Sequence, residues 1–386
     1  MNLRLGIIGA GQLGLYLCQA AKSLGIDTCV LSDDGRAPAV SFADHLVIGP
    51  AEDHDTLDNF IEACDVVTFE KEDIPNEALH QLIEAEAAGR IRVHPGAHVL
   101  YLLKDKGTQK TWLMDQGFPT LPFTLLQGDH VDVDQLVADY GIPLVQKARC
   151  GGYDGLGVQI LREASELTRL WKTPSLIEPF LPDCREIAIL AARDVEGNCL
   201  SYPVFGMDFD PALNLVTTVF TPSRLPSSLA DSALALGAQV LDALGGVGVF
   251  AIEMFVTPDD RLYINEISPR VHNSGHLTME ASPASQFDMH VRACAGLPLP
   301  DVSSTQAAAM ANVLYEDRLA NCCPDSPVRW LNETERLAVH WYGKAPGRQG
   351  RKMGHITALA DTAAAASEAA LKALEKLPEL SETQAA

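Results

Sequence analysis

The first hundred residues alternate between short apolar segments and longer segments with a helical pattern. Four segments are short and mostly apolar, as expected of buried strands: Leu3–Ile8, Thr28–Leu31, His45–Ile48 and Val66–Phe69. Two longer segments, Leu13–Leu24 and Glu77–Glu86, have the composition of helices. Strands that alternate with helices are typical of an open parallel sheet with helices on both faces. We therefore predict an α/β, Rossmann-like domain over residues 1–100.

The end of the chain has a different pattern. A stretch rich in Ser, Thr and Ala just after residue 300 has the composition of a linker. Three predicted strands and one Ala-rich predicted helix follow it: Ala309–Leu314, Arg336–Trp341, Gly354–Ala358, and Asp361 to about Leu377. We therefore predict a small carboxy-terminal β-rich domain over residues 301–386, with a terminal helix.

Two apolar segments near residue 260 predict a β-hairpin that carries two carboxylates, Glu253 and Glu266. If Val256 pairs with Arg261 across the turn, Glu253 lies opposite Ile264. The two carboxylates are then diagonal neighbours on one face, about 7–8 Å apart. Such a pair suits Mg²⁺, which binds one or two carboxylates together with substrate phosphates. The alternative is a solvated hairpin face with an unrelated acid on each strand.

A dense group of polar side chains follows the second strand of this hairpin. Arg270, His272, Asn273 and His276 fall within seven residues. Loops carry binding and catalytic residues more often than the framework that supports them. This group therefore favours a functional hairpin over a solvated one.

The turn from Gly9 to Gly14 has the G-x-G-x-x-G spacing of a dinucleotide-binding turn. Asp33 and Asp34 follow about twenty residues later, where such domains carry an acid for the ribose. The motif alone leaves open an NAD-dependent oxidoreductase and a nucleotide-binding regulatory module. The paired carboxylates of the later hairpin argue against both, because neither function needs two Mg²⁺ ligands.

A second glycine-rich segment follows a predicted strand that ends at Lys147. Four of the eight residues from Cys150 to Gly157 are glycine. Glycines let backbone N–H groups approach phosphate oxygens and let a loop move as a cover. Lys147 adds a point charge suited to a phosphate, which makes an ordinary flexible hairpin the less favoured interpretation.

Composition limits the possible partners. The 386 residues carry a formal charge of −22, which disfavours nucleic acid and anionic membranes. No apolar run has the length of a membrane span, and the first residues lack the features of a signal peptide. The nine cysteines show no C-x-x-C spacing, so a reducing cytoplasm fits best. A phosphorylated ligand would need a local cluster of cations, and four lie between Lys344 and Lys352.

The run Asn-Glu-Ile-Ser-Pro-Arg-Val-His-Asn-Ser-Gly-His, from Asn265 to His276, resembles a family signature, N-E-x-x-P-R-x-H-N-S-G-H. The family is that of the ATP-grasp N5-carboxyaminoimidazole ribonucleotide synthetases of purine biosynthesis. The segment from Tyr342 to His355 similarly resembles its Y-x-K and R-x-G-R-K-M-G-H runs. The resemblance implies an α/β and α+β multidomain protein with an ATP-grasp fold. A pre-ATP-grasp domain would precede the ATP-grasp domain at 101–300, whose lid subdomain would span about 112–185.

The resemblance also implies an ATP-dependent ligase with Mg²⁺, or Mn²⁺, held by Glu253 and Glu266. The residues that it assigns to ATP are Lys106, Lys147, Gly152, Asp154, Gly155, Glu178, Glu186 and Asn265. Lys106 and Lys147 would hold the phosphates, Glu178 would begin the hinge that meets adenine, and Glu186 would accept from the ribose hydroxyls. For Lys104, Lys106 and Lys110 together, a solvated helix face is the alternative.

The implied reaction carboxylates the amine of 5-aminoimidazole ribonucleotide with bicarbonate, through carboxyphosphate, and forms ADP and phosphate. Arg270, His272 and Asn273 would be the catalytic residues. The resemblance assigns six residues to the ribonucleotide acceptor: Glu70, Tyr153, Arg270, Lys344, Arg351 and Lys352. It also implies a cytoplasmic homodimer with small-molecule substrates and with no nucleic-acid or membrane partner.

The chain departs from the family pattern in three places. The glycine-rich loop usually reads G-G-Y-D-G-K/R-G-Q, whereas this chain has Leu156 and Val158. The amino-terminal turn has Leu15 where the family has a basic residue, and a family histidine is missing from Phe205–Asp210. A paralogous ATP-grasp ligase that acts on another phosphorylated acceptor is therefore the alternative function.

Overall fold

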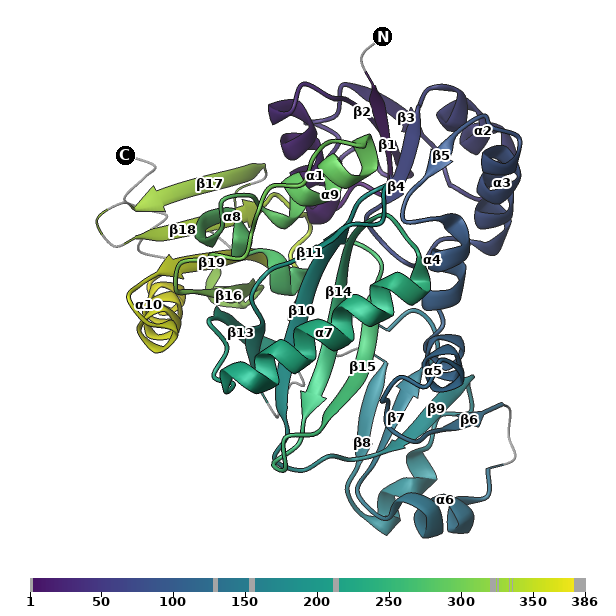
Figure 1. The fold of residues 1–386 in the computed structure, drawn as a ribbon, viewed down its shortest axis with the longest axis vertical. Helices are drawn as coiled ribbons and strands as arrows, with labels where there is room; N and C mark the ends of the chain where they lie inside the picture. The colour runs from purple at the N-terminus through teal and green to yellow at the C-terminus, as the bar shows by residue number, and fades with distance from the viewer. Residues whose placement is uncertain are drawn as a thin grey trace.

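A computed structural model describes most of the chain and arranges it around one large central sheet (Figure 1). The described residues are 3–127, 131–152, 157–210, 215–319, 324, 326–332, 334 and 336–377. Three predicted site residues, Tyr153, Asp154 and Gly155, lie outside them, as does Leu156. Among the described residues, no helix is long and apolar enough to cross a membrane.

A five-stranded parallel sheet forms the amino-terminal domain, with the strand order β3-β2-β1-β4-β5. Its strands are β1 (Arg4–Ile8), β2 (Asp27–Ser32), β3 (His45–Ile48), β4 (Val66–Phe69) and β5 (Arg92–Val93). Its helices are α1 (Gln12–Ser23), α2 (His54–Glu62), α3 (Asn76–Ala87) and α4 (Ala97–Leu103). Leu5 and Ile7 pack with α1 in one core, whereas Ile8 packs with α2 and α3 in another. Alternate residues of one buried strand thus serve opposite faces, which confirms the predicted Rossmann-like arrangement.

A ten-stranded antiparallel sheet forms the centre of the molecule, with the order β15-β14-β10-β12-β13-β16-β19-β18-β17 and β11 paired to β10. The strands before residue 270 are β10 (Arg185–Arg193), β11 (Cys199–Ser201), β12 (Phe205–Asp210), β13 (Leu215–Thr221), β14 (Gly248–Val256) and β15 (Leu262–Ser268). The later strands are β16 (Ala308–Leu314), β17 (Pro327–Asn332), β18 (Leu337–Tyr342) and β19 (Lys352–Leu359). Because β13 pairs with β16, the carboxy-terminal strands extend the same sheet.

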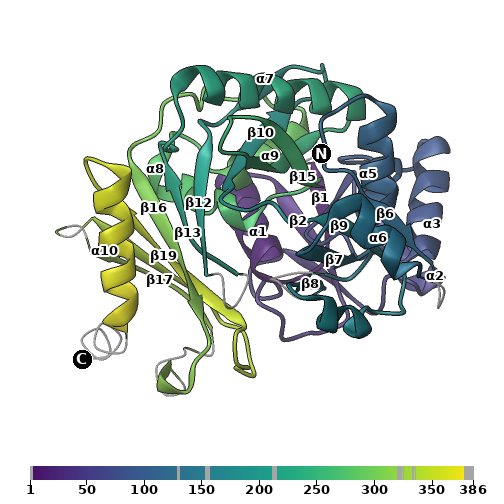
Figure 2. The same cartoon turned by 90° about the horizontal axis from the view of Figure 1, so that it is seen from below.

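Helices cover both faces of this central sheet. Helix α7 (Ser227–Leu244) packs on one face through Ala233 and Val240, and α9 (Gln286–Ala295) packs on the other through Phe287 and Met289. Helix α10 (Ala363–Glu375) covers the carboxy-terminal strands, as Figure 2 shows from below. The α/β and α+β architecture predicted from the sequence is confirmed.

A separate four-stranded antiparallel sheet, with the order β6-β9-β7-β8, lies beside the β14–β15 hairpin (Figure 1). Its elements are β6 (Thr124–Leu126), α6 (Val133–Tyr140), β7 (Leu144–Ala148), β8 (Val158–Leu161), the 3₁₀ helix η1 (Ala164–Arg169) and β9 (Ser175–Pro179). Helix α5 (Lys106–Asp115) leads into it. Thr120, between α5 and β6, pairs with Ile264 of β15, so the entrance to the small sheet is fixed against the hairpin.

Candidate active site

Glu253 of β14 lies directly opposite Glu266 of β15. Val256 pairs with Leu262, and Asn265 is the extra residue of a β-bulge that shifts the register between Met254 and Glu253. The predicted pairing of Glu253 with Ile264 is therefore wrong. The turn is one residue longer than predicted, and the bulge adds one more residue. A total shift of two residues preserves the faces, so both carboxylates still lie on the same face.

A third carboxylate, that of Glu186 on β10, shares this face. Ala188 pairs with Glu253, and Glu186 is two residues before Ala188 on the same strand. Burial, with the nearby Glu253 charge, raises the pKa of Glu186 to about 8. Burial, with the nearby Glu266 charge, raises the pKa of Glu253 to about 7. Clustered acids that resist ionising together form a site that a divalent cation would stabilise.

Two lysines from different elements face these acids. Lys106, the first residue of α5, forms an ion pair with Glu266. The Nζ atom of Lys147 on β7 donates to Oδ1 of Asn265 at 2.7 Å, so the bulged residue contacts the small sheet. Burial, with the Lys106 cation, lowers the pKa of Lys147 to about 8. The structure thus brings together five predicted site residues: Lys106, Lys147, Glu253, Asn265 and Glu266.

Helix α5 presents one polar face to the interior. Lys106, Gln109 and Lys110 have the i, i+3, i+4 spacing of neighbours on one face. Gln109 is buried, and its amide both accepts from the backbone N–H of Ile267 at 2.8 Å and donates to its carbonyl at 3.0 Å. Lys110 is also buried and is paired with Glu178. The alternative of a solvated helix face is therefore wrong.

The loop after β15 is held close to the acids. Nε2 of His272 lies 3.7 Å from Oε1 of Glu253, while the guanidinium of Arg270 binds Glu72 at 2.8 Å. The side chain of Gln286 donates to the carbonyl of His272 at 2.7 Å and accepts from its N–H at 2.8 Å. No sequence pattern singles out Glu72, because only the fold brings the strand end after β4 to Arg270.

The two other polar residues of this loop have partners elsewhere. The amide of Asn273 donates to Oδ1 of Asn312 on β16 at 2.9 Å. His276 is fully buried and stacks on His355 of β19, with ring centroids 4.7 Å apart. Burial, with the His340 ring nearby, holds the pKa of His276 well below its usual range. Both side chains therefore fix the loop to the carboxy-terminal strands.

The amino-terminal glycine turn holds a carboxylate of the chain itself. Glu70, directly after β4, accepts from the N–H groups of Gly11 at 2.6 Å and Gly14 at 2.7 Å. Gly9 has a φ of +109°, and a Cβ there would lie 2.3 Å from Cγ of Glu70. The three glycines make room for Glu70 at the start of α1, where a dinucleotide-binding domain would hold a pyrophosphate.

The basic loop between β18 and β19 contributes cations from the carboxy-terminal domain. Nζ of Lys344 donates to the carbonyl of Lys352 at 3.1 Å. Nη1 of Arg351 donates to the carbonyl of Pro346 at 2.7 Å. Lys352 is buried, and its charge acts to lower the pKa of Glu253. Lys352, at the start of β19, is therefore a buried cation whose charge reaches the acid of β14.

The described ends of the glycine-rich loop approach each other closely. Gly157 has a φ of +83°, and a Cβ there would lie 2.9 Å from Cα of Gly152. Ala148, at the end of β7, donates its N–H to the carbonyl of Gly157 at 2.8 Å, and its Cβ would lie 3.3 Å from a Cβ at position 157. Glycine at 157 is therefore required by the closure of this loop as well as by backbone conformation.

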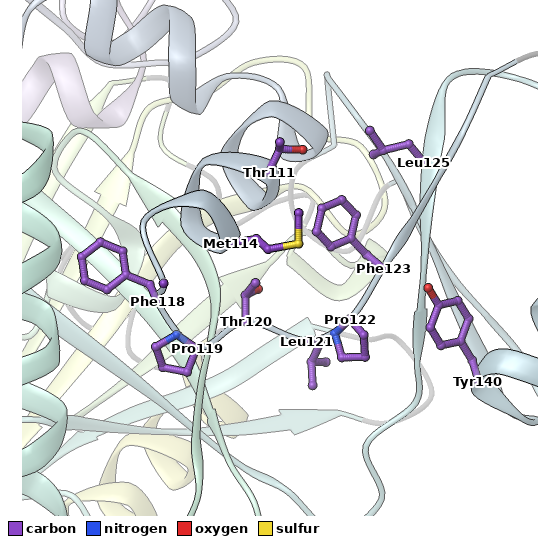
Figure 3. A pocket seen from close by; sticks show the side chains of 11 residues that line it. Thr111, Met114, Phe118, Pro119, Thr120, Leu121, Pro122, Phe123, Leu125 and Tyr140 are labelled. Atoms are coloured by element: carbon purple, nitrogen blue, oxygen red, sulfur yellow. The ribbon is translucent and has the colours of Figure 1, made fainter.

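An apolar cavity of about 520 Å³ lies apart from these charged groups (Figure 3). Side chains from α5, the segment leading to β6, and α6 line it, among them Met114, Phe118, Phe123 and Tyr140. None of the predicted site residues lines it. Phe123 separates it from the charged face of α5, because the Lys110 ammonium lies 5.5 Å from the centre of the Phe123 ring.

Three family models match successive parts of the chain. The ribonucleotide synthetase preATP-grasp domain matches residues 2–104, and the ATP-grasp domain matches residues 111–287. The phosphoribosylaminoimidazole carboxylase C-terminal domain matches residues 308–369. The order and positions of these matches parallel the three parts of the fold.

Known relatives are similar over almost the full chain. N5-carboxyaminoimidazole ribonucleotide synthase of Synechococcus elongatus is 35% identical over 359 residues, with 92% of this chain and 88% of that protein covered. Phosphoribosylaminoimidazole carboxylase of Ogataea methanolica is 34% identical, and the match covers 91% of this chain but only 65% of that longer protein.

Solved structures agree. N5-carboxyaminoimidazole ribonucleotide synthetase of Thermotoga maritima is 33% identical, with a TM-score of 0.83 and coverage of 97% and 98% of the two chains. N5-carboxyaminoimidazole synthase of Aspergillus clavatus, in complex with ADP and 5-aminoimidazole ribonucleotide, is 27% identical, with a TM-score of 0.85 and coverage of 98% and 99%. Together with the acid and lysine cluster, these matches establish that the chain belongs to the N5-carboxyaminoimidazole ribonucleotide synthetase family of ATP-grasp ligases.

Proposed function

We propose that this chain carboxylates 5-aminoimidazole ribonucleotide with bicarbonate and ATP, and forms N5-carboxyaminoimidazole ribonucleotide, ADP and phosphate. The observation that carries the proposal is the cluster of Glu186, Glu253 and Glu266 on one sheet face, opposed by Lys106 and Lys147. Phosphoryl transfer depends on positioning and charge neutralisation, and this cluster offers groups for both.

Oxygen ligands on a sheet face fit Mg²⁺, with Mn²⁺ as a second candidate. Glu253 and Glu266 are the proposed ligands, because they lie opposite each other and because burial and the Glu266 charge raise the pKa of Glu253 to about 7. When bound, the metal would neutralise charge on the ATP phosphates. Glu186, whose backbone strand adjoins the hairpin, is the proposed acceptor for the ribose hydroxyls.

The remaining nucleotide contacts would come from the small sheet and its loop. Lys106 and Lys147 would bind the phosphates as point charges, and Asn265 would keep Lys147 aimed at them. The strand end at Glu178 would begin the hinge against adenine. Backbone N–H groups of the loop, which contains Gly152, Asp154 and Gly155, would cover the phosphates.

Arg270 and His272 would act on bicarbonate and carboxyphosphate. His272 lies beside Glu253 and its backbone is clamped by Gln286, so the imidazole is held where anionic charge would develop. Arg270, oriented by Glu72, would supply a guanidinium donor to the same charge. Asn273 would hold this loop through Asn312 rather than act on the substrate directly.

The acceptor's phosphate would bind the cations of the carboxy-terminal loop, Lys344, Arg351 and Lys352. A strongly acidic chain can bind such an anion only where cations are concentrated. Tyr153 would stack on the imidazole ring. Glu70 was also predicted to contact the acceptor. Both of its carboxylate oxygens already accept a hydrogen bond, from Gly11 and from Gly14, so a contact with the acceptor would use their remaining lone pairs.

A paralogous ligase with a different phosphorylated acceptor is the second candidate. It is favoured by Leu156, which replaces a basic family residue, and by the histidine missing from Phe205–Asp210. Phe209, in that segment, packs against the apolar core beneath β12. Both candidates keep the same ATP and metal residues and differ only in the acceptor.

Phosphate release tests the proposal directly. With ATP, Mg²⁺ and bicarbonate, release should rise strongly when 5-aminoimidazole ribonucleotide is added. Unchanged release with that acceptor, together with intact ADP binding, would favour the second candidate. No ADP binding at all would contradict both. A cytoplasmic homodimer belongs to the same proposal. Light scattering of the purified chain would test the dimeric state.

A further inference from the structure

Behind the proposed phosphate site, three charged side chains form a buried group: Lys110 of α5, Glu178 of β9 and Lys147 of β7. Their side chains are 3%, 2% and 11% exposed. One carboxylate oxygen of Glu178 binds the Lys110 ammonium, and the other binds the Lys147 ammonium at 2.7 Å. Glu178 and Lys147 face the same side of the small sheet, because Glu178 pairs with Val145, two residues before Lys147.

The charges of this group decide what Lys147 can bind. Burial and the nearby Lys147 and Lys106 charges lower the pKa of Lys110, whereas its direct contact with the Glu178 carboxylate favours the charged ammonium. With Lys110 held charged in this way, two cations and one carboxylate leave a net charge of +1 next to the phosphate site. Without Lys110, Glu178 and Lys147 would form a neutral ion pair, and Lys147 would attract a phosphate far less. Little water reaches these groups, so their charges are weakly screened.

We infer that Lys110 is a positioning residue for nucleotide binding, which neutralises Glu178 and so leaves the charge of Lys147 available to a phosphate. Lys110 acts through Glu178 and does not touch the nucleotide itself. The inference rests on the proposed nucleotide site, but not on the identity of the acceptor.

The attachment of α5 makes the pairing rigid. On the same helix face, Lys106 binds Glu266 and the Gln109 amide binds both backbone groups of Ile267. One helix therefore holds the acid of β15 and the acid of β9 at a fixed separation. A lysine that only filled space would not need a carboxylate partner such as Glu178. The ring of Phe123, next to Lys110, would already cover the apolar side of the helix there.

Calorimetric titration with ADP and Mg²⁺ tests the inference, because it needs no acceptor. Lys110→Met should weaken ADP binding about tenfold or more, which is the scale of one lost charge at several ångströms in a partly screened site. The double variant Lys110→Met/Glu178→Gln should recover most of that loss, because Lys147 again carries the net charge of +1. A purely structural lysine predicts the opposite, since a second buried change would add to the damage.

Lys104→Met is the matched control. Lys104 precedes α5 and binds the Ile74 carbonyl and, at 3.0 Å, the Asn76 side chain of the amino-terminal domain, so ADP affinity should not change. Circular dichroism and the melting temperature establish that each variant is folded. If Lys110→Met does not fold, Lys110→Gln carries the test, because its amide can still donate to Glu178 but has no charge, and it should weaken ADP binding to a similar extent.

Three results would overturn the inference: unchanged ADP affinity in folded Lys110→Met, a double variant as weak as or weaker than Lys110→Met, or unchanged ADP affinity in folded Lys110→Gln. Failure of the proposed nucleotide site looks different, because the unmodified chain would then bind no ADP, and failure of the proposed acceptor would leave these ADP affinities unchanged. With substrate turnover, Lys110→Met should raise KM for ATP and leave KM for the acceptor within about twofold, since only the nucleotide elements are affected.

Discussion

Glu253 and Glu266 face each other across the β14–β15 hairpin, and the bulge at Asn265 is what aligns them. A regular ladder would offset the two acids, whereas the bulge also turns Asn265 toward Lys147 of the small sheet. One inserted residue therefore joins the acid pair to the segment proposed to bind phosphates. Bulges beside active sites commonly redirect a side chain in this way.

Replacing Glu266 with Gln should leave the fold intact and lower phosphate release by at least about a hundredfold, because charge neutralisation at the phosphates is lost. The isosteric amide keeps the volume of the side chain but cannot neutralise the metal or pair with Lys106. Steady-state phosphate release with ATP and bicarbonate measures the effect.

Glu196→Gln is a suitable control for that measurement, since Glu196 lies in the exposed turn between β10 and β11. It should behave as the unmodified chain does. Turnover of Glu266→Gln within a few-fold of normal would remove Glu266 from the metal site.

Metal affinity should depend on pH in a defined direction. Burial and the Glu266 charge raise the pKa of Glu253 to about 7, so this carboxyl is mostly protonated at pH 6 and mostly ionised at pH 8. Only the ionised form binds a cation, so affinity should rise with pH, by about tenfold from pH 6 to pH 8. Electron paramagnetic resonance of Mn²⁺ without nucleotide follows this binding.

Glu253→Gln should remove most of that pH dependence along with much of the affinity. Glu186, with its pKa raised to about 8, would leave a weaker dependence at higher pH. A Mn²⁺ affinity that stays flat from pH 6 to pH 9 would contradict the assignment of these carboxylates.

Apolar periodicity was enough to predict most of the fold. Four of the five strands of the amino-terminal sheet and the helices α1 and α3 agree with the structure to within one or two residues, because buried parallel strands are continuous apolar runs. The short strand β5 and the helices α2 and α4 were not predicted. β17 was missed. Its residues alternate between half-buried and exposed positions at the edge of the sheet, so its apolar signal is weak.

Less of the candidate site than of the fold could be predicted from the sequence, for two physical reasons. The hairpin register depended on a bulge at Asn265, which no periodicity encodes. The partners of Glu178, Arg270 and Glu70 are long-range contacts, so Lys110, Glu72 and the glycine turn acquire their roles only when the chain folds. A lysine that is buried and one that is solvated look the same in a helical segment.

The glycine turn should prove structural and should not bind NAD. Gly9→Ala should lower the free energy of unfolding by roughly 2–4 kcal/mol, because a methyl group at φ +109° is strained and would lie 2.3 Å from Glu70. Denaturant titration measures this. Gly25→Ala is the control, since Gly25 also has a positive φ but nothing within 4 Å, and it should cost only about 1 kcal/mol.

Calorimetry should detect ADP and no NAD in the unmodified chain. Glu70 already accepts from the amides that would bind a pyrophosphate, so NAD would have to displace a carboxylate held by two hydrogen bonds. Micromolar NAD binding that a substitution of Gly11 abolishes would reverse this interpretation of the turn.

Arg351→Ala should raise KM for the ribonucleotide acceptor by about ten- to a hundredfold and leave KM for ATP nearly unchanged. The loop of Arg351 lies between β18 and β19, whereas the proposed nucleotide contacts come from α5 and the small sheet. An arginine fork on a phosphate makes charge-assisted hydrogen bonds of roughly 1.5–3 kcal/mol each, which sets the size of the effect.

Arg318→Ala is the control, because Arg318 pairs with Glu316 on the exposed surface of the same domain. A higher KM for ATP with an unchanged KM for the acceptor would assign the loop to the nucleotide. If neither constant changes, the loop is solvated surface, and the acceptor's phosphate must be bound by cations elsewhere in this acidic chain.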